Sequence, residues 1–205
     1  MIMLNIALTK GRLEESTIKL LQRAGINCAP LINKGRKLVV NLDDAYNVVF
    51  AKANDVVTYV EYGVADVGVV GKDTLMEMSR PVYEILDLKF GACRFSVAAP
   101  SGTDIYSLDK VITIATKYPA VTRNFFESRN MDVDIVKIEG SVELAPILKL
   151  ADAIVDLVET GKTLKENNLE IIDNIASISA RLIVNPATLK TKKQEIEKLV
   201  SIFVD

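Results

Sequence analysis

The sequence predicts an α/β protein with two lobes that face each other across a cleft. Short β-branched runs alternate with segments of helical periodicity, a pattern typical of mostly parallel sheets. Two distant segments, 60–75 and 148–164, share an Ala-Asp pair, a short apolar strand, then Gly-Lys and a helix start. Two lobes of similar topology would produce this weak internal repeat, although two ordinary βα units in one sheet would produce it as well.

The expected strands are β-branched runs bounded by Gly, Asp, Asn or Pro. In order they are LNIAL (4–8), KLVVNL (37–42), YNVVFAK (46–52), DVGVV (66–70), VITIAT (111–116), VDIVKI (133–138) and AIVDLV (153–158). The second and third runs alternate on either side of Asp43-Asp44, which predicts an antiparallel hairpin. The sheet is therefore expected to be mixed.

Two helices carry clear apolar stripes. The first follows the first strand and ends at Gly25, and its stripe is Leu13, Thr17, Leu20, Leu21 and Ala24. The last is expected to return to the first lobe, with a stripe formed by Leu189, Ile196, Leu199, Val200 and Phe203. We place the lobes at 1–88 with 174–205 and at 89–173, with crossings near LDLKFGACR and NLEIIDNIASIS.

Composition excludes several classes of function. The 205 residues are 49% hydrophobic with a net charge of -2, so no long basic face for nucleic acid is expected. The apolar run at the N-terminus is too short for a signal core or a membrane span, which predicts a cytoplasmic protein. Cys28 and Cys93 lie far apart and are expected to be buried free thiols. The absence of histidine excludes imidazole acid-base chemistry and His-ligated metals.

The segment ADAIVDLVETGKTL (151–164) carries the strongest chemical signal. The phosphate loop of nucleotide kinases is excluded, because the residue five before Gly161 is Asp156 rather than glycine. Gly161 still lets backbone amides approach an anion, and Thr160 and Thr163 add hydroxyls at a helix start. An ordinary capped turn would explain these residues equally well. A carboxylate inside the apolar run, however, indicates a polar ligand such as a sugar diol.

Other polar residues lie at expected strand ends. Lys10 and Arg12 follow the first strand, where open α/β sheets bind ligands and cations can meet phosphates, although a solvated turn is the simpler explanation. Gly71 and Asp73 lie at a second strand-to-helix turn. A third such turn presents Lys117, Thr122 and Arg123. Glu143 follows a Gly-Ser pair and is either a ligand contact or a first-turn helix carboxylate.

Taken together, these segments resemble the ATP phosphoribosyltransferase family along nearly the whole chain. The blocks that carry the resemblance are ALTKGRL, YVEYGVADVGVVGKDTL, CRFSVAAP, IATKYPAVTRNFF, EGSVELAP and LADAIVDLVETGKTLKENNLE. The resemblance implies a two-lobed fold like the type II periplasmic binding proteins. It also implies a reaction in which N1 of ATP adenine attacks C1 of phosphoribosyl pyrophosphate and releases pyrophosphate, with Mg²⁺ held through substrate phosphates and not by a protein metal site.

The resemblance assigns roles to individual positions. Glu143, Asp156, Glu159, Thr160, Gly161, Lys162 and Thr163 would bind phosphoribosyl pyrophosphate, with the ribose hydroxyls on Asp156 and the 5′-phosphate on the turn. Lys10, Arg12 and Lys52 would be catalytic through the phosphates and the leaving group. The ATP site would comprise Lys10, Arg12, Asp66, Gly71 and Asp73. Three residues depart from the family's usual choice: Lys52 for Arg, Ala120 for Asn and Lys149 for Gly.

The resemblance is to the short form of the family, because long members continue into a regulatory domain beyond the position of Asp205. It implies a homodimer that joins a histidyl-tRNA-synthetase-like regulatory subunit in a hetero-octamer, with histidine sensed on the partner. Two alternatives remain open at this point. One is a non-enzymatic two-lobed module that binds a small anion or nucleotide, and the other is a different phosphoribosyl-transferring or nucleotide-binding enzyme.

Overall fold

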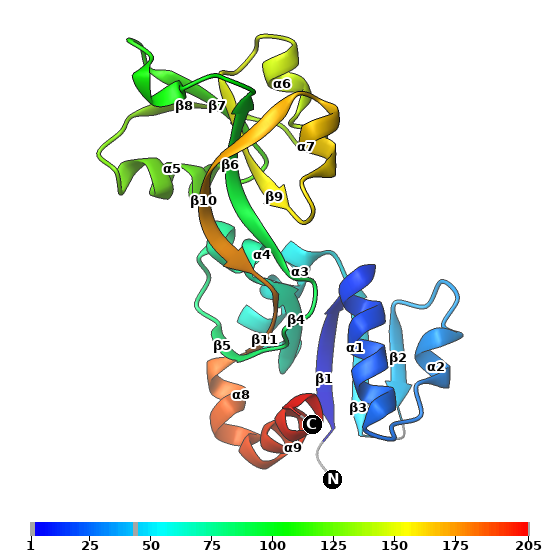
Figure 1. Ribbon diagram of the computed structural model, residues 1–205. Helices are drawn as coiled ribbons and strands as arrows, with labels where there is room; N and C mark the ends of the chain where they lie inside the picture. The colour runs from blue at the N-terminus through cyan, green and yellow to red at the C-terminus, as the bar shows by residue number, and fades with distance from the viewer. Residues whose placement is uncertain (1–2, 43–44, 205) are drawn as a thin grey trace. The chain divides into compact units, whose positions relative to one another are not determined.

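The structure is a computed structural model that describes residues 3–42 and 45–204 (Figure 1). The chain divides into two compact units, residues 1–91 with 179–205 and residues 92–178. The divisions fall inside the two segments where crossings were expected, a few residues beyond the boundaries placed at 88 and 173.

Unit 1 contains a six-stranded mixed sheet in the order β2-β3-β1-β4-β11-β5. Its strands are β1 (Leu4–Thr9), β2 (Val39–Leu42), β3 (Tyr46–Ala51), β4 (Val67–Gly71), β5 (Tyr83–Asp87) and β11 (Ala180–Val184). Strands β3, β1 and β4 are parallel, so the residues that follow them meet at one edge of the sheet. The expected hairpin is confirmed, because β2 pairs antiparallel with β3, and its Asp43-Asp44 link lies outside the described residues.

Helices cover both faces of the sheet in unit 1. They are α1 (Arg12–Arg23), α2 (Ala29–Ile32), α3 (Ala53–Glu61), α4 (Lys72–Met78), α8 (Pro186–Thr191) and α9 (Lys193–Val204). Alternate residues of β1 point to opposite faces: Ile6 packs with α1 and α9, whereas Ala7 packs with α3. Gly68 on β4 lets α3 approach closely, since a Cβ there would lie 2.8 Å from the side chain of Val56.

The expected single C-terminal helix is two helices, α8 and α9. The chain leaves helical geometry at Lys192, whose φ is -125° and ψ 36°. Its side chain instead binds the Asp66 carboxylate at 2.7 Å and the Met3 carbonyl at 3.2 Å. The apolar stripe therefore continues across a break that periodicity alone did not reveal.

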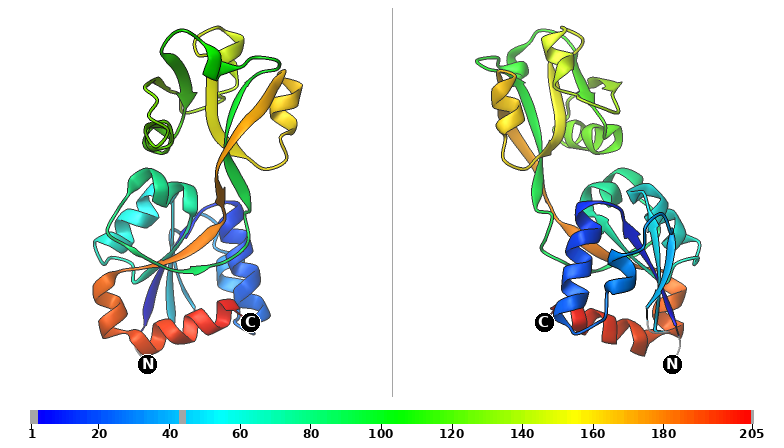
Figure 2. Two further views of the ribbon diagram at one scale, coloured as in Figure 1. Left: turned by 60° about the vertical axis from the view of Figure 1, so that its left-hand side comes forward. Right: turned by 90° about the vertical axis from the view of Figure 1, so that its right-hand side faces the viewer.

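Unit 2 contains a five-stranded mixed sheet in the order β10-β6-β9-β7-β8. Its elements are β6 (Cys93–Pro100), a 3-10 turn (Ile105–Ser107), β7 (Ile112–Thr116), α5 (Pro119–Glu127), β8 (Val133–Lys137), α6 (Leu144–Ile147), β9 (Ala153–Val158), α7 (Lys162–Glu166) and β10 (Leu169–Ile178). Strands β9, β7 and β8 are parallel, so their carboxyl ends meet at one edge. Helices α5 and α7 lie on opposite faces of this sheet (Figure 2).

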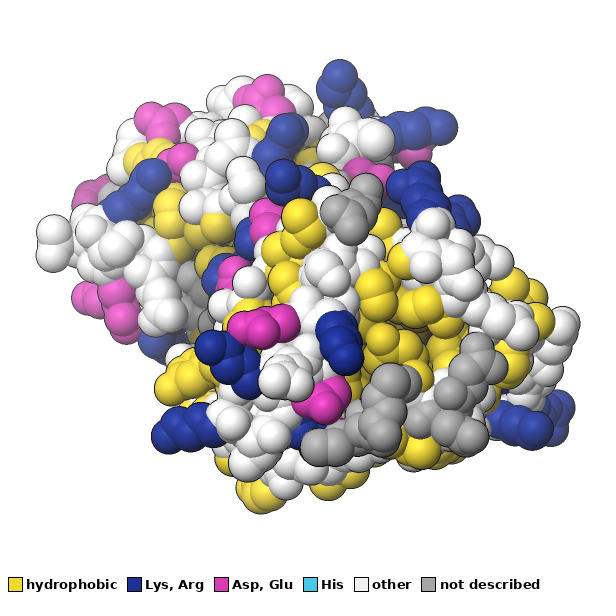
Figure 3. Space-filling model, turned by 90° about the horizontal axis from the view of Figure 1, so that it is seen from below, with side chains coloured by type: hydrophobic (Ala, Val, Ile, Leu, Met, Phe, Trp, Pro, Cys, Tyr) yellow, Lys and Arg dark blue, Asp and Glu magenta, His cyan; other side chains and the backbone are white. Residues whose placement is uncertain are grey.

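Charged side chains of both signs are interspersed on the surface seen from below, with hydrophobic side chains among them (Figure 3). This mixture agrees with the formal net charge of -2. Cys28 is buried and Cys93 partly buried, and neither forms a disulfide. No helix among the described residues is long and apolar enough to cross a membrane.

Candidate functional site

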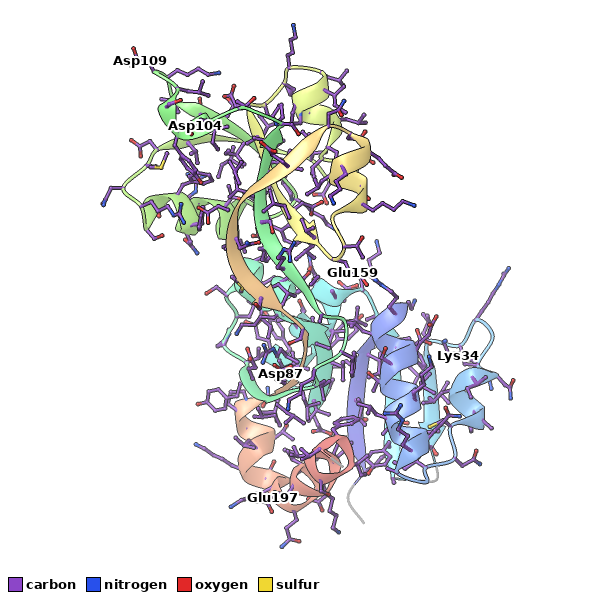
Figure 4. All side chains as sticks on the ribbon, viewed as in Figure 1. Lys34, Asp87, Asp104, Asp109, Glu159 and Glu197 are labelled. Carbon is purple, nitrogen blue, oxygen red and sulfur yellow. The ribbon has the colours of Figure 1, made fainter. Side chains whose placement is uncertain are left out.

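A pocket of about 220 Å³ lies in unit 2 at the carboxyl end of β9. Figure 4 shows Glu159 at this end of the strand. All seven residues expected to bind phosphoribosyl pyrophosphate line this one pocket: Glu143, Asp156, Glu159, Thr160, Gly161, Lys162 and Thr163. Ten residues line the pocket, and the remaining three are Leu157, Val158 and Leu164. The structure therefore brings a set spread over 21 positions of sequence, 143–163, to one place.

Strand alternation puts Asp156 on the pocket face of the sheet. Ile154 and Val158, two positions to either side, are buried in a cluster with Val142 and Leu164 from around α6 and α7. Successive side chains of a strand point to opposite faces, so Asp156 shares the face of Ile154 and Val158. It is only half-buried, because the strand ends here and the pocket opens over it. A carboxylate in an apolar run is thus accounted for by its position at the pocket.

The turn from Glu159 to Thr163 is held by an apolar residue on each side. Val158 and Leu164 are each 5% exposed and belong to the same hydrophobic cluster. Between them Gly161 has a φ of 76°, a left-handed conformation that glycine adopts without steric cost. The N–H groups in the first turn of α7 have no acceptor within the helix, and that of Lys162 donates to the Thr160 hydroxyl at 3.4 Å. A short glycine turn with amide and hydroxyl donors can bind an oxyanion.

The charge on Asp156 is opposed by its surroundings. Burial raises the pKa of this carboxyl group, the N–H of Leu157 lowers it by hydrogen bonding, Glu143 raises it by repulsion, and Lys117 lowers it by attraction. The net effect is a raised pKa. A carboxylate whose own protein environment disfavours its charge is typical of a ligand-binding or catalytic site.

The side chains that line the pocket carry more negative than positive charge. Glu143, Asp156 and Glu159 are carboxylates, and Lys162 is the one cationic side chain of the lining. Its side chain is 80% exposed and lies 3.7 Å from Glu166 on the following turn of α7. A polyanionic ligand would therefore need cations beyond the lining itself. Oxygen donors of this kind suit a hard cation such as Mg²⁺.

Five of the six residues expected in unit 1 lie at one edge of its sheet. Lys10 directly follows β1 and Lys52 directly follows β3, and these strands end side by side because the Lys10 N–H donates to the Ala51 carbonyl at 3.0 Å. Arg12 begins α1 just after Lys10, and both side chains are exposed. The cations thus meet at the carboxyl edge of the parallel strands, where ligands bind in open α/β sheets.

Gly71 and Asp73 reach the same edge from β4. Gly71 is the last residue of β4 and directly precedes α4. The Asp73 carboxylate folds back over Gly71 and occupies the space where a Cβ would stand. Only glycine fits at this position while Asp73 keeps that geometry. Backbone and carboxylate are therefore presented together beside the end of β1.

Asp66 does not join the others, and we remove it from the expected ATP site. It precedes β4, at the opposite end of the strand from Gly71, and is 5% exposed. Its carboxylate accepts hydrogen bonds from the Asn5 N–H at 2.8 Å, the Thr188 hydroxyl at 3.3 Å and the Lys192 ammonium at 2.7 Å. Asp66 therefore fastens the C-terminal helices to the start of β1. An Ala-Asp pair before a strand looks the same in sequence whether the carboxylate serves a ligand or the fold.

Within residues 3–42 and 45–204, no group of three or more His, Cys, Asp or Glu side chains is placed to hold a metal ion. The pocket carboxylates Glu143, Asp156 and Glu159 do not form such a group. Any Mg²⁺ at this pocket would need ligands from the substrate and water, which is the usual mode for this ion.

Comparisons with known proteins agree on one family. The family model described as ATP phosphoribosyltransferase matches residues 52–204. The ATP phosphoribosyltransferase of Clostridium kluyveri is 56% identical over 199 residues, covering 97% of this chain and 91% of the relative. That of Bacillus cereus (strain AH820) is 56% identical over 203 residues, covering 98% and 95%. These relatives are enzymes, which argues against a non-enzymatic binding module.

Solved structures support the same assignment. The ATP phosphoribosyl transferase (HisG:HisZ) complex from Thermotoga maritima contains a chain that matches with a TM-score of 0.85 at 36% identity, covering 98% of this chain and 96% of that one. The periplasmic aliphatic sulphonate binding protein SsuA from Escherichia coli matches with a TM-score of 0.60 at 9% identity, covering 98% and 70%. The second match concerns the fold alone and confirms the expected periplasmic-binding-protein-like architecture.

Sequence, fold and site geometry converge on transfer of a phosphoribosyl group to ATP, the first step of histidine biosynthesis. The match to the family model covers most of the chain. The chain belongs to the ATP phosphoribosyltransferase family.

Proposed function

We propose that the pocket of unit 2 binds phosphoribosyl pyrophosphate for transfer of its phosphoribosyl group to N1 of ATP. The observation that supports this is the gathering of all seven expected residues around one pocket. In this proposal the Thr160–Thr163 turn receives the 5′-phosphate, with amide and hydroxyl donors. Asp156 and Glu143 accept hydrogen bonds from the ribose hydroxyls, which are donors that two carboxylates can share.

The reaction needs no protein nucleophile. Adenine N1 already carries a lone pair, so the C1–O bond to pyrophosphate can break as N1 bonds to C1, and the electron pair leaves with pyrophosphate. What the protein supplies is alignment of the two substrates and positive charge at the leaving group. We assign ATP binding to Lys10, Arg12, Gly71 and Asp73, and stabilisation of the departing charge to Lys10, Arg12 and Lys52. This division of labour is compatible with a chain that has no histidine.

Mg²⁺ fits this site as an ion that arrives with the substrate. When bound it would supply positive charge to the pyrophosphate. The pocket offers carboxylate oxygens of Glu143, Asp156 and Glu159, the ligand type that Mg²⁺ prefers directly or through water. The pocket residues then orient the ribose and hold the 5′-phosphate.

We further propose that the chain works as the short form, in a hetero-oligomer with a histidyl-tRNA-synthetase-like regulatory subunit in the cytoplasm. The support is the match to a chain of the Thermotoga maritima HisG:HisZ complex, 96% of which is covered. A homodimer that joins the regulatory subunit in a hetero-octamer is the assembly we expect. Histidine would then inhibit only in the presence of the partner, and inhibition of the purified chain alone would contradict this part.

Product formation tests the proposed function directly. The chain is mixed with ATP, phosphoribosyl pyrophosphate and Mg²⁺, and phosphoribosyl-ATP is followed by its ultraviolet absorbance, with and without a regulatory subunit. Product that requires both substrates and increases with the subunit is the expected result. Absence of product in both mixtures, with ATP binding retained, would overturn the proposal. Replacing ATP by other nucleotides serves as the specificity control.

A further inference from the structure

We propose that Lys117 is a further substrate-binding residue of this site, whose ammonium group holds the diphosphate of phosphoribosyl pyrophosphate. The inference rests on the proposed function and extends it to a residue outside the ten that line the pocket. Lys117 directly follows β7, the strand beside β9 in the sheet. In register, Thr116 pairs with Val155, so Lys117 comes level with Asp156.

The side chain of Lys117 is directed to the pocket face by its neighbours. The ring of Tyr118 packs edge-on against Phe95, with centroids 4.8 Å apart, and Phe95 alternates with Ser96 on β6. Ser96 is paired with Asp156 and so shares its face, which places Phe95 and Tyr118 on the opposite face. Ala115, two residues before Lys117, belongs to the buried cluster on the face of Asp156, and Lys117 is close enough to Asp156 to lower its pKa. These observations place Lys117 on the face of Asp156.

The turn that carries Lys117 is fixed by buried hydrogen bonds. The Thr116 hydroxyl donates to the Val155 carbonyl at 2.7 Å and accepts from the Tyr118 N–H at 2.9 Å. The Thr122 side chain and N–H both donate to the Tyr118 carbonyl, at 2.8 and 3.0 Å. Thr116 and Thr122 are fully buried. A lysine on a turn locked in this way is held ready for a ligand at a reduced entropic cost.

Lys117 has no ion-pair or hydrogen-bond partner for its ammonium group within the described parts of the chain. The nearby Glu139 is paired with Lys137 at 2.9 Å. Lys117 nevertheless lies close enough to lower the pKa of both Asp156 and Glu139. An unpaired cation beside a pocket with surplus negative charge is a ready partner for an anionic ligand.

The order of groups along the site indicates that Lys117 binds the diphosphate and not the 5′-phosphate. In phosphoribosyl pyrophosphate the two ribose hydroxyls lie between the carbon that bears the 5′-phosphate arm and C1, which bears the diphosphate. In the protein, Asp156 has Lys117 level with it on the neighbouring strand and the Glu159–Thr163 turn beyond it at the end of β9. With the 5′-phosphate on the turn and the hydroxyls on Asp156, the diphosphate is directed toward Lys117.

Calorimetric titration with two probes tests this assignment. Phosphoribosyl pyrophosphate with Mg²⁺ and ribose 5-phosphate, which lacks the diphosphate, are titrated into the full chain and into K117Q, K117R and K165Q. Lys165 is an exposed lysine of α7 that does not line the pocket. We expect K117Q to lower the affinity for phosphoribosyl pyrophosphate by about tenfold, the loss typical of one charge-assisted hydrogen bond. The affinity of K117Q for ribose 5-phosphate should change by less than about twofold. K117R should retain most of the affinity for phosphoribosyl pyrophosphate, and K165Q should bind both probes as the unmodified chain does.

The outcomes separate this inference from the proposed function. If the unmodified chain neither binds phosphoribosyl pyrophosphate nor forms product, the proposed function fails. If it does both and K117Q binds the two probes as the unmodified chain does, Lys117 has no role at the site. If K117Q loses the same affinity for both probes, Lys117 contacts the 5′-phosphate and not the diphosphate, which would overturn the assignment. Urea unfolding of each variant checks that the fold is intact, so that a general loss of structure is not mistaken for a lost contact.

Discussion

Asp156 and Glu143 line the same pocket, and the negative charge of Glu143 adds to burial in raising the pKa of Asp156. The two carboxylates come from different elements, β9 and the residue before α6, so the repulsion is imposed by the fold. Repulsion between the two carboxylates lowers the free energy of unfolding of the ligand-free protein. Such strain is expected where a ligand with hydroxyl donors, or a cation, relieves it.

Asp156→Asn should therefore lose activity while the protein becomes more stable at neutral pH. Asn removes the charge that burial and Glu143 oppose and keeps an oxygen that can accept from the Leu157 N–H. We expect kcat/KM to fall about 30-fold or more, which corresponds to on the order of 2 kcal/mol of transition-state stabilisation. The midpoint of urea unfolding at pH 7.5 should rise. Unchanged kcat/KM would contradict the role of Asp156.

The pH dependence of the same variant gives an independent check. The folded-state pKa of Asp156 is raised, so the unmodified protein loses stability as pH rises from the unfolded-state value of about 4 through the folded value. Asn does not titrate, so the stability difference between the two proteins should vanish at acidic pH and grow toward neutral pH. A difference that is constant over this range would mean that charge is not its cause.

Local sequence signals predicted the elements around the pocket well. The apolar run with one Asp, followed by Thr and Gly, is local information, and it correctly indicated β9 and the turn after it. The hairpin of β2 and β3 was likewise visible because its alternation is local. Strands β5, β6, β10 and β11 were not anticipated. They pair with each other over long separations in sequence: Arg181 lies opposite Asp87, and Ile178 lies opposite Cys93.

Roles that depend on distant partners could not be read from the sequence. Asp66 was expected at the ATP site, yet its partner Lys192 lies 126 positions away and could not be foreseen. Lys117 was noticed at a strand end, but only the register of β7 against β9 brings it level with Asp156. Local patterns thus indicate which residues can do chemistry, and tertiary pairing decides which of them meet.

Gly161→Ala should lower the affinity for phosphoribosyl pyrophosphate in addition to lowering the free energy of unfolding. Gly161 has a φ of 76°, and Gly102, outside the pocket lining, has a φ of 78° and open space around a Cβ. Ala at either position should cost about 1 kcal/mol of unfolding free energy, because the left-handed conformation disfavours a side chain. Only G161A should also reduce affinity for phosphoribosyl pyrophosphate, which titration calorimetry would detect. Equal affinity in the two variants would argue against backbone recognition by the turn.

Lys149→Gly should stabilise the protein. The φ of Lys149 is 58°, a left-handed conformation. The Leu150 N–H donates to the Ala145 carbonyl at 2.8 Å and the Lys149 N–H to the Pro146 carbonyl at 3.0 Å, the pair of bonds that ends a helix in a Schellman motif. Glycine at this left-handed position should add about 1 kcal/mol to the free energy of unfolding. Lys198→Gly, inside α9, is the control and should cost about 1 kcal/mol, because glycine destabilises helix interiors.

Asp152→Asn should destabilise unit 2, although Asp152 does not line the pocket. The Asp152 carboxylate accepts from the Lys110 ammonium at 2.6 Å and from the Thr113 N–H at 2.9 Å, while its own N–H donates to the Thr113 carbonyl at 2.8 Å. These bonds join the start of β9 to the start of β7. Burial acts to raise the pKa of Asp152, but the bonds from Lys110 and Thr113 outweigh it, and the pKa is lowered.

The sign of that pKa change fixes the pH profile of the variant. A folded-state pKa below the unfolded value of about 3.9 means that Asp152 stabilises the fold above that value and loses this contribution as pH falls through the folded pKa. Asp152→Asn should therefore lower the free energy of unfolding by about 2 kcal/mol at pH 7, the usual contribution of hydrogen bonds to a charged group. In urea unfolding the gap between the two proteins should narrow progressively as pH falls below about 3.9. Narrowing would identify the lost charge as the cause, whereas a gap that stays constant with pH would point to a packing defect.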